Sequence, residues 1–148
     1  MSANGLISQA LGLQVSYFIL KGKLTQIHLT QIERKLLIIA GLNQSIGIIL
    51  SFALEISLKS LLMLRFNNFP KSHDLQKLYK ALSDSDRFEI AKLYKVKTNF
   101  SIEECLEKHK DTFVEYRYLE IESHFNDIDA NEALNTIIEF YNQIKVEE

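Results

Sequence analysis

The sequence has one cysteine and little net charge, and each shortage excludes a class of structure or function. Cys105 is the only cysteine, so neither a disulfide within the chain nor a cysteine-based zinc cage is possible. This usage fits a reducing compartment, and we expect a cytoplasmic protein. The net charge is −2, so no overall positive field attracts nucleic acid, and any RNA contact has to be local.

Alternating strand patterns, internal repeats and low-complexity tracts are also missing, whereas signals for the start of a helix recur. Four of them match or approximate a capping box, in which a short polar side chain precedes a carboxylate by three positions: Thr30 with Glu33, Ser101 with Glu104, Thr112 with Glu115 and Asp129 with Glu132. We therefore predict one all-α domain over residues 1–148. Its fold would be an up-and-down bundle of four to five main helices with short connecting helices.

The expected helices follow from apolar spacing and from the positions of glycine and proline. Gly22 should stop the first helix, Gly41 should bend the second, and Pro70 should break the chain after it. The expected ranges are 6–21, about 31 to 66 with its apolar part at 44–66, 73–82, 86–94, a helix from about 102 that merges into the one carrying Arg117, and 130–145.

Residues 36–54 carry no charge over about nineteen positions, which is close to the length of a membrane span. Polar residues interrupt the run at 43–45, and Glu55 and Lys59 follow directly on the same helical pattern. Residues 1–4 lack the basic residues of a secretory signal. We interpret the segment as a buried core helix and expect no membrane association.

Glu55 and Lys59 lie one turn apart on a helix that is apolar nearly all round. Burying a charge without a partner costs several kcal/mol, so both should be paired or lie at a cleft. Arg117 and Glu120, on a facing helix, are the expected partners. This pattern is consistent both with an internal charge network and with a functional site.

Arg117 and His124 are seven positions apart, together with Phe113 and Glu120 on one stripe of a helix. Seven residues make nearly two turns, so the two residues lie on one face about 10 Å apart along the helix axis. The long arginine side chain can cover much of that distance, so the guanidinium and the imidazole could reach one phosphodiester. A histidine can transfer a proton at an RNA 2′-hydroxyl or at the leaving oxygen, and a guanidinium can hold the phosphate. A solvated, salt-bridged helix surface is the alternative.

The segment 69–75, FPKSHDL, opens the next helix, with Ser72 as the expected N-cap and Asp74 in the first turn. His73 is a second candidate acid or base, or a phosphate contact; alternatively it packs in a capping segment. His28 and His109 are expected at the surface.

Three pieces in this order, EISLKSLL at 55–62, SHDLQKL at 72–78 and FVEYRYLE at 113–120, resemble the HEPN superfamily, particularly small prokaryotic members with a His-Asp-Leu motif. The resemblance implies a helical bundle that is often a two-fold dimer. Many members are metal-independent ribonucleases of toxin–antitoxin or phage-defence systems. Others are inactive scaffolds or partners of nucleotidyltransferases.

The family's catalytic signature is an arginine, four to six residues, and a histidine, which Arg117 and His124 fit. The resemblance implies that Arg117 binds the scissile phosphate, that His124 acts as acid and base, and that Glu55 supports them. Ribonuclease members usually follow the arginine with a small polar residue, where this chain has Tyr118.

Two functions follow. The first is an endoribonuclease with its site at a homodimer cleft, acting on RNA without metal or cofactor and controlled by an antitoxin. The second is a non-catalytic module that dimerises or binds a nucleotide or a nucleotidyltransferase, which the acidic pI and Tyr118 favour.

Overall fold

The computed structural model describes residues 2–25, 32–109 and 127–147, and this part of the chain forms six helices and no strand. The all-α prediction is therefore confirmed, whereas the single domain over 1–148 stays a prediction. The helices are α1 (Ala3–Thr25), α2 (Ile32–Phe66), α3 (Leu75–Lys80), α4 (Asp84–Thr98), α5 (Ile102–His109) and α7 (Asp127–Glu147).

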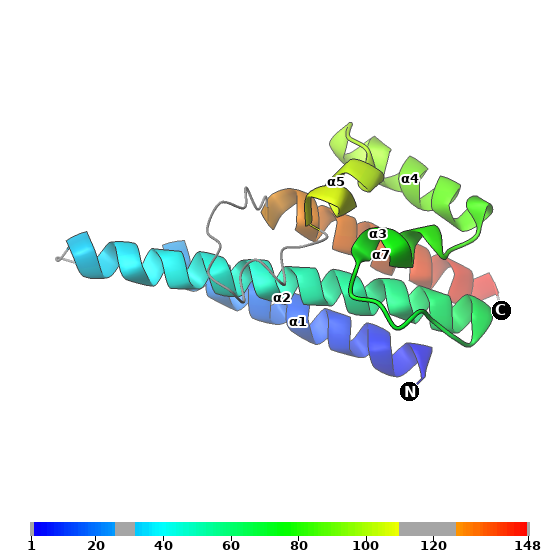
Figure 1. Cartoon of the computed structure of the whole chain (residues 1–148), viewed down its shortest axis with the longest axis horizontal. Helices are drawn as coiled ribbons and strands as arrows, with labels where there is room; N and C mark the ends of the chain where they lie inside the picture. The colour runs from blue at the N-terminus through cyan, green and yellow to red at the C-terminus, as the bar shows by residue number, and fades with distance from the viewer. Residues whose placement is uncertain (1, 26–31, 110–126, 148) are drawn as a thin grey trace.

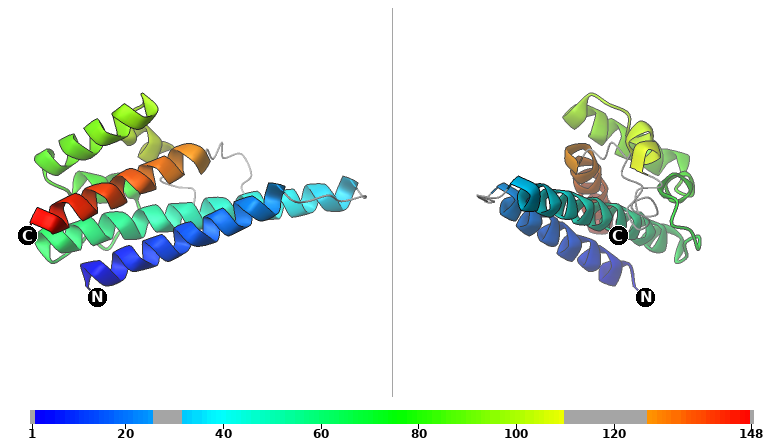
Figure 2. Two further views of the ribbon diagram at one scale, coloured as in Figure 1. Left: turned by 180° about the vertical axis from the view of Figure 1, so that it is seen from behind. Right: turned by 60° about the vertical axis from the view of Figure 1, so that its left-hand side comes forward.

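The four long helices lie side by side in the order α1, α2, α7, α4 (Figures 1 and 2). α2 and α7 run in one direction, and α1 and α4 run in the other (Figure 1). The short helices α3 and α5 contact each other, and they also pack on α2 and α7 respectively. Both ends of the chain lie at the same end of the bundle (Figure 1), where the Tyr141 hydroxyl donates to Asn4 Oδ1 at 2.9 Å.

α2 is the central element of the core. Its buried leucines include Leu50, Leu54, Leu58 and Leu61, all without exposed surface. The small, buried Ser60 lies where α1 begins, and its hydroxyl donates to the Ala3 carbonyl at 2.9 Å. By length and composition Ile38–Phe66 could cross a membrane, but 72% of its most apolar window is buried inside the protein. This burial is that of a core helix.

One glycine prediction was wrong. Gly22 does not stop α1, which continues to Thr25. Gly41 lies within the continuous helix α2, and the predicted bend there stays a prediction. Glycine costs a helix interior about 1 kcal/mol relative to alanine. Packing of both helices against each other outweighs that penalty.

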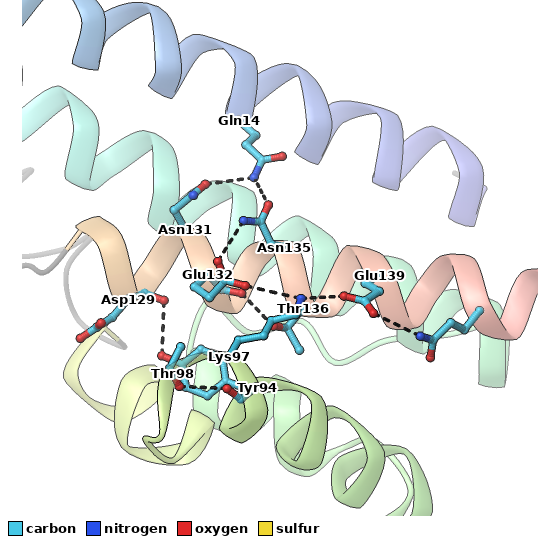
Figure 3. A network of polar contacts seen from close by, with 11 residues as sticks. Gln14, Tyr94, Lys97, Thr98, Asp129, Asn131, Glu132, Asn135, Thr136 and Glu139 are labelled. Atoms are coloured by element: carbon cyan, nitrogen blue, oxygen red, sulfur yellow. Dashed lines mark hydrogen bonds and ion pairs between the residues drawn. The ribbon is translucent and has the colours of Figure 1, made fainter.

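α7 is held on two sides by polar contacts (Figure 3). On one side Gln14 of α1 donates to Asn131 Oδ1 at 3.0 Å and to Asn135 Oδ1 at 2.6 Å. On the other side Lys97 of α4 pairs with Glu139 at 2.6 Å and Glu132 at 3.4 Å. The apolar face of α7 is part of the core, because five of its side chains are buried there: Leu134, Ile137, Ile138, Tyr141 and Ile144.

The helix starts agree with the predicted caps only in part. Ser101 accepts a hydrogen bond from the Glu104 N–H at 3.4 Å, as expected of a cap. Asp129 cannot be a cap, because α7 begins earlier, at Asp127. α4 begins at Asp84, slightly earlier than expected, and its cap is Ser83, whose hydroxyl accepts from the Asp86 N–H at 3.1 Å. Thr30 and Thr112 lie outside the described residues.

Candidate functional site: a buried carboxylate and an exposed histidine

Glu55 lies on the second half of α2 and is 4% exposed, so its carboxylate has lost most of its hydration. Two groups replace that water. Lys59, one turn along the same helix, places Nζ 2.7 Å from Oε1, and its side chain is itself only 13% exposed. His73, from the segment between α2 and α3, places Nδ1 3.0 Å from both carboxylate oxygens. Buried charges need such partners to be tolerated.

The segment 67–74 brings His73 back onto α2. It leaves the helix at Asn67, which takes a left-handed conformation with φ 51°. Phe69 then packs against the core, and its ring centroid lies 5.5 Å from Lys59 Nζ, a cation–π contact. Lys59 is therefore held from two sides, by the carboxylate and by the aromatic ring.

Each residue of the His-Asp-Leu motif has a separate role. His73 reaches Glu55, Asp74 caps α3, and Leu75 enters the core at 2% exposure. Asp74 Oδ1 accepts from the Lys77 N–H at 3.0 Å, so Asp74 is the N-cap and the prediction of Ser72 was wrong. The Ser72 hydroxyl instead accepts a hydrogen bond from the Asp74 N–H at 3.1 Å and thereby helps to position Asp74 as the cap of α3.

The contact between His73 and Glu55 determines which ring nitrogen carries hydrogen. A carboxylate only accepts hydrogen bonds, so Nδ1 is the donor. In the neutral ring the lone pair is then on Nε2, which is the arrangement of a carboxylate-oriented histidine base. The His73 side chain is 73% exposed, so its ring meets solvent while its orientation is fixed by a buried group.

A second ion pair, not expected from the sequence, follows on the same helix. Arg65 at the end of α2 donates to Asp86 of α4 at 2.9 Å, and the Asp86 side chain is 8% exposed. The two residues are 21 positions apart, and such a separation leaves no periodic signal in the sequence. This pair fixes α4 relative to the end of α2.

A third cluster of titratable groups surrounds a small cavity of about 50 Å³ between α4, α5 and the start of α7. Tyr94, Cys105 and Asp129 are among its lining residues. Burial raises the pKa of the Cys105 thiol to about 11, which makes it a poor nucleophile. Nearby, His109 is 1% exposed, so its predicted surface position was wrong. The apolar spacing Ile102, Cys105, Leu106, His109 indicates this buried face.

The predicted site residues divide into two groups. The structure brings Glu55, Lys59 and His73 together. Arg117, Glu120 and His124 lie in 110–126 and His28 in 26–31, outside the described residues, so their predicted positions stay predictions. Within the described residues, no group of three or more His, Cys, Asp or Glu side chains is arranged to hold a metal ion.

The family model of the HEPN domain matches residues 35–147, which span α2 almost entirely and continue to the end of α7. α1 lies before the matched region. Comparisons with curated proteins and with solved structures gave no match.

Proposed function

The chain belongs to the HEPN domain family, and from that premise we propose that it is a cytoplasmic, metal-independent endoribonuclease of a toxin–antitoxin or phage-defence system. HEPN domains commonly dimerise, and we propose a homodimer whose cleft receives RNA. The observation that carries the proposal is the exposed His73, whose ring is oriented by the buried Glu55.

The proposed reaction needs three kinds of group. Arg117 would hold the scissile phosphate, while the 2′-oxygen attacks phosphorus and the bond from phosphorus to the 5′-oxygen breaks. One base takes the 2′-hydroxyl proton and one acid gives a proton to the leaving 5′-oxygen, so a 2′,3′-cyclic phosphate forms. His124 and the oriented His73 would supply these two proton transfers, with Glu55 and Lys59 as positioning residues and Glu120 placing Arg117.

A second candidate function is a non-catalytic module that dimerises or binds a nucleotide, an antitoxin or a nucleotidyltransferase. The observation that favours it is the pairing of Glu55, since Lys59 and His73 already satisfy this carboxylate. A network of this kind stabilises a fold without any reaction. The residue type at position 118, a tyrosine directly after the arginine, also favours this second function.

Cleavage of total RNA by the purified protein in EDTA tests the proposal. We expect products that end in a cyclic phosphate, and a loss of about 100-fold or more for Arg117→Ala and His124→Ala. His28→Ala, which changes a histidine outside the family signature, is the matched control and should cleave normally. Cleavage that needs a divalent cation, or that survives His124→Ala, would contradict the mechanism.

His73 has its own readout in the pH profile. With two proton-transfer groups the rate should rise and then fall with pH, and His73→Ala should remove one limb of that curve. If His73 were only structural, the variant would change stability but leave the shape of the profile unchanged. Absence of cleavage together with tight nucleotide or partner binding would favour the second candidate function.

A further inference from the structure

α4 has an exposed face that is both apolar and basic. Its inner face is buried through Asp86, Ile90 and Tyr94. On the opposite face Phe88 is 67% and Val96 is 81% exposed. Figure 2 shows α4 at the margin of the bundle, on the side opposite α1. Exposed apolar side chains that gather on one surface mark a site of interaction.

A groove of about 550 Å³ lies on this exposed face. Six residues of α4 and its cap line it: Phe88, Ala91, Lys92, Lys95, Val96 and Asn99. Steps of four, three and four residues connect Phe88, Lys92, Lys95 and Asn99, so these side chains form one stripe about 16 Å long. We call the six residues the α4 groove.

The α4 groove is a local basic site on a chain whose net charge is −2. Lys92 pairs with Glu89 at 3.6 Å, but both side chains are exposed, so the pair contributes little and is readily exchanged. Within residues 2–25, 32–109 and 127–147, Lys95 makes no ion pair. Lys97, by contrast, turns towards α7 and pairs with Glu139 (Figure 3). Two ammonium groups are therefore available in the groove.

A single-stranded nucleic acid is a ligand that uses both features of the groove. Proteins hold such strands by stacking bases on exposed aromatic rings and by pairing lysine or arginine with the phosphates. Phe88 supplies the ring, and Lys92 and Lys95 supply the charges, one and two turns further along. At about 3.4 Å per stacked nucleotide the stripe accommodates about five nucleotides. We propose that the α4 groove binds single-stranded RNA.

The order of the side chains along α4 favours a strand over an amphipathic partner helix. Such a helix docks through a continuous apolar row. In the α4 groove, Lys92 and Lys95 lie between Phe88 and Val96 along the helix, and covering their ammonium groups with apolar side chains would cost energy. An RNA strand carries a phosphate at every nucleotide, so it satisfies both ammonium groups while a base stacks on Phe88.

The α4 groove lies apart from the described groups of the proposed reaction. Glu55, Lys59 and His73 belong to α2 and to the segment 67–74, and none of them lines the groove. The groove therefore holds a part of the strand away from the phosphodiester that is cleaved. The identification of the strand as RNA rests on the proposed function, whereas binding in the groove needs no reaction.

Fluorescence anisotropy with a labelled strand of about ten nucleotides tests the proposal. Every ribose of this RNA is 2′-O-methylated, so the proposed reaction cannot cleave it. The full chain should bind it with a dissociation constant on the order of 10 µM. Phe88→Ala should weaken binding at least about fivefold, because it removes the stacking surface. Phe18→Ala, which changes a 55% exposed phenylalanine on α1, is the matched control and should bind as wild type does.

The salt dependence of binding separates charge from stacking. Lys95→Gln should weaken binding and reduce the slope of log affinity against log salt concentration by about 0.7, the value of one phosphate contact on a single strand. Phe88→Ala should leave that slope unchanged. Lys23→Gln is the matched control, since Lys23 is likewise an exposed lysine in the last turn of a long helix. Circular dichroism of each variant checks that the helices have formed.

Three results would overturn the proposal. The first is a strand that does not bind, or whose binding neither Phe88→Ala nor Lys95→Gln weakens. The second is an RNA duplex that binds as tightly as the single strand, because its paired bases cannot stack on Phe88. The third is a polyglutamate peptide that binds equally well and displaces the strand, which would make an acidic protein the occupant.

Cleavage of unmodified RNA by the same samples is scored separately. A protein that binds through the α4 groove without cleaving supports this inference and counts against the enzyme. A protein that cleaves RNA while its binding ignores the α4 groove overturns this inference alone.

Discussion

Glu55 belongs to a buried charge network that stabilises the fold, and it also orients His73, the proposed proton-transfer group. Its carboxylate is buried, so the Lys59 ammonium and the His73 imidazole have to supply the hydrogen bonds that water would otherwise make. The two partners differ in their exposure: Lys59 is nearly buried, and His73 is mostly in solvent. Their contributions to the free energy of unfolding should differ accordingly.

We predict that Lys59→Met lowers the free energy of unfolding by about 3 kcal/mol, because it leaves a buried carboxylate without its ammonium. His73→Ala should cost less than about 1 kcal/mol, since an exposed partner contributes little. Urea denaturation at pH 7 measures both. Glu55→Gln combined with Lys59→Met removes both charges and should recover part of the loss. Equal losses for Lys59→Met and His73→Ala would show that Lys59 is not the main partner.

His109 should make stability depend on pH. Burial lowers its pKa to about 4; Asp129 opposes this shift and Lys108 adds to it. Below about pH 6.5 the unfolded chain takes up a proton that the folded protein excludes. The free energy of unfolding should therefore fall as the pH drops from about 6.5 to about 4, by up to about 3 kcal/mol, and this contribution is fully retained above about pH 6.5.

The measurement is a set of urea titrations between pH 7 and pH 4 on wild type and His109→Gln. The variant should lose less stability over this interval, whatever its stability at pH 7. Comparing the two proteins removes the contribution of the other histidines. Identical slopes would mean that His109 titrates normally in the folded state.

At the scale of the single residue, the sequence revealed pairs that are close along the chain. Glu55 and Lys59 are four positions apart, so helical spacing places them one turn apart on the same helix, although the partners we expected were Arg117 and Glu120. The partnership of Glu55 with His73 spans 18 positions, and that of Tyr17 with Asp127 spans 110. Such contacts depend on how helices pack, which apolar periodicity does not specify.

At the scale of the element, α3 depends on its cap because it has only six residues. So short a helix is not stable by itself, and Asp74 satisfies one of its free N–H groups. We predict that Asp74→Ala lowers the free energy of unfolding by about 1 kcal/mol. Ser72→Ala should cost less, since Ser72 only supports the cap. Thermal unfolding of the two variants compares them, and a larger effect of Ser72→Ala would reverse the assignment.

The type and order of the helices could be predicted from sequence, but not all of their ends. The glycine at position 22 is a stop signal in an isolated helix. In the folded protein Lys21, directly before this glycine, pairs with Asp127 at 2.7 Å, and α1 continues past the glycine to Thr25. Local signals compete with packing that involves residues more than a hundred positions away, and here packing is stronger.

At the scale of the whole molecule, α1 is part of the core although it precedes the family match. It buries Leu6, Ile7, Ala10 and Tyr17. Its Tyr17 hydroxyl also donates to Asp127 at 2.9 Å, and burial, with that contact, raises the pKa of Tyr17 to about 12. Residues 35–147 alone therefore lack one wall of the bundle.

We predict that deleting residues 1–25 lowers the free energy of unfolding by about 5 kcal/mol or causes aggregation. It removes three large buried side chains and exposes the α2 surface that they cover. Soluble yield and the urea midpoint measure the effect. Val15→Lys changes only an exposed side chain of α1 and should leave the stability nearly unchanged. A truncated chain as stable as wild type would show that α1 is not part of the core.

The hydrogen bond between Asn4 and Tyr141 joins the first turn of α1 to the last turns of α7. With both termini at one end of the bundle, a short peptide linker would suffice to connect them (Figure 1). New ends could then be opened after the left-handed Asn99, where α4 has already finished. Such a circularly permuted protein would keep every described helix intact while changing which of them leaves the ribosome first.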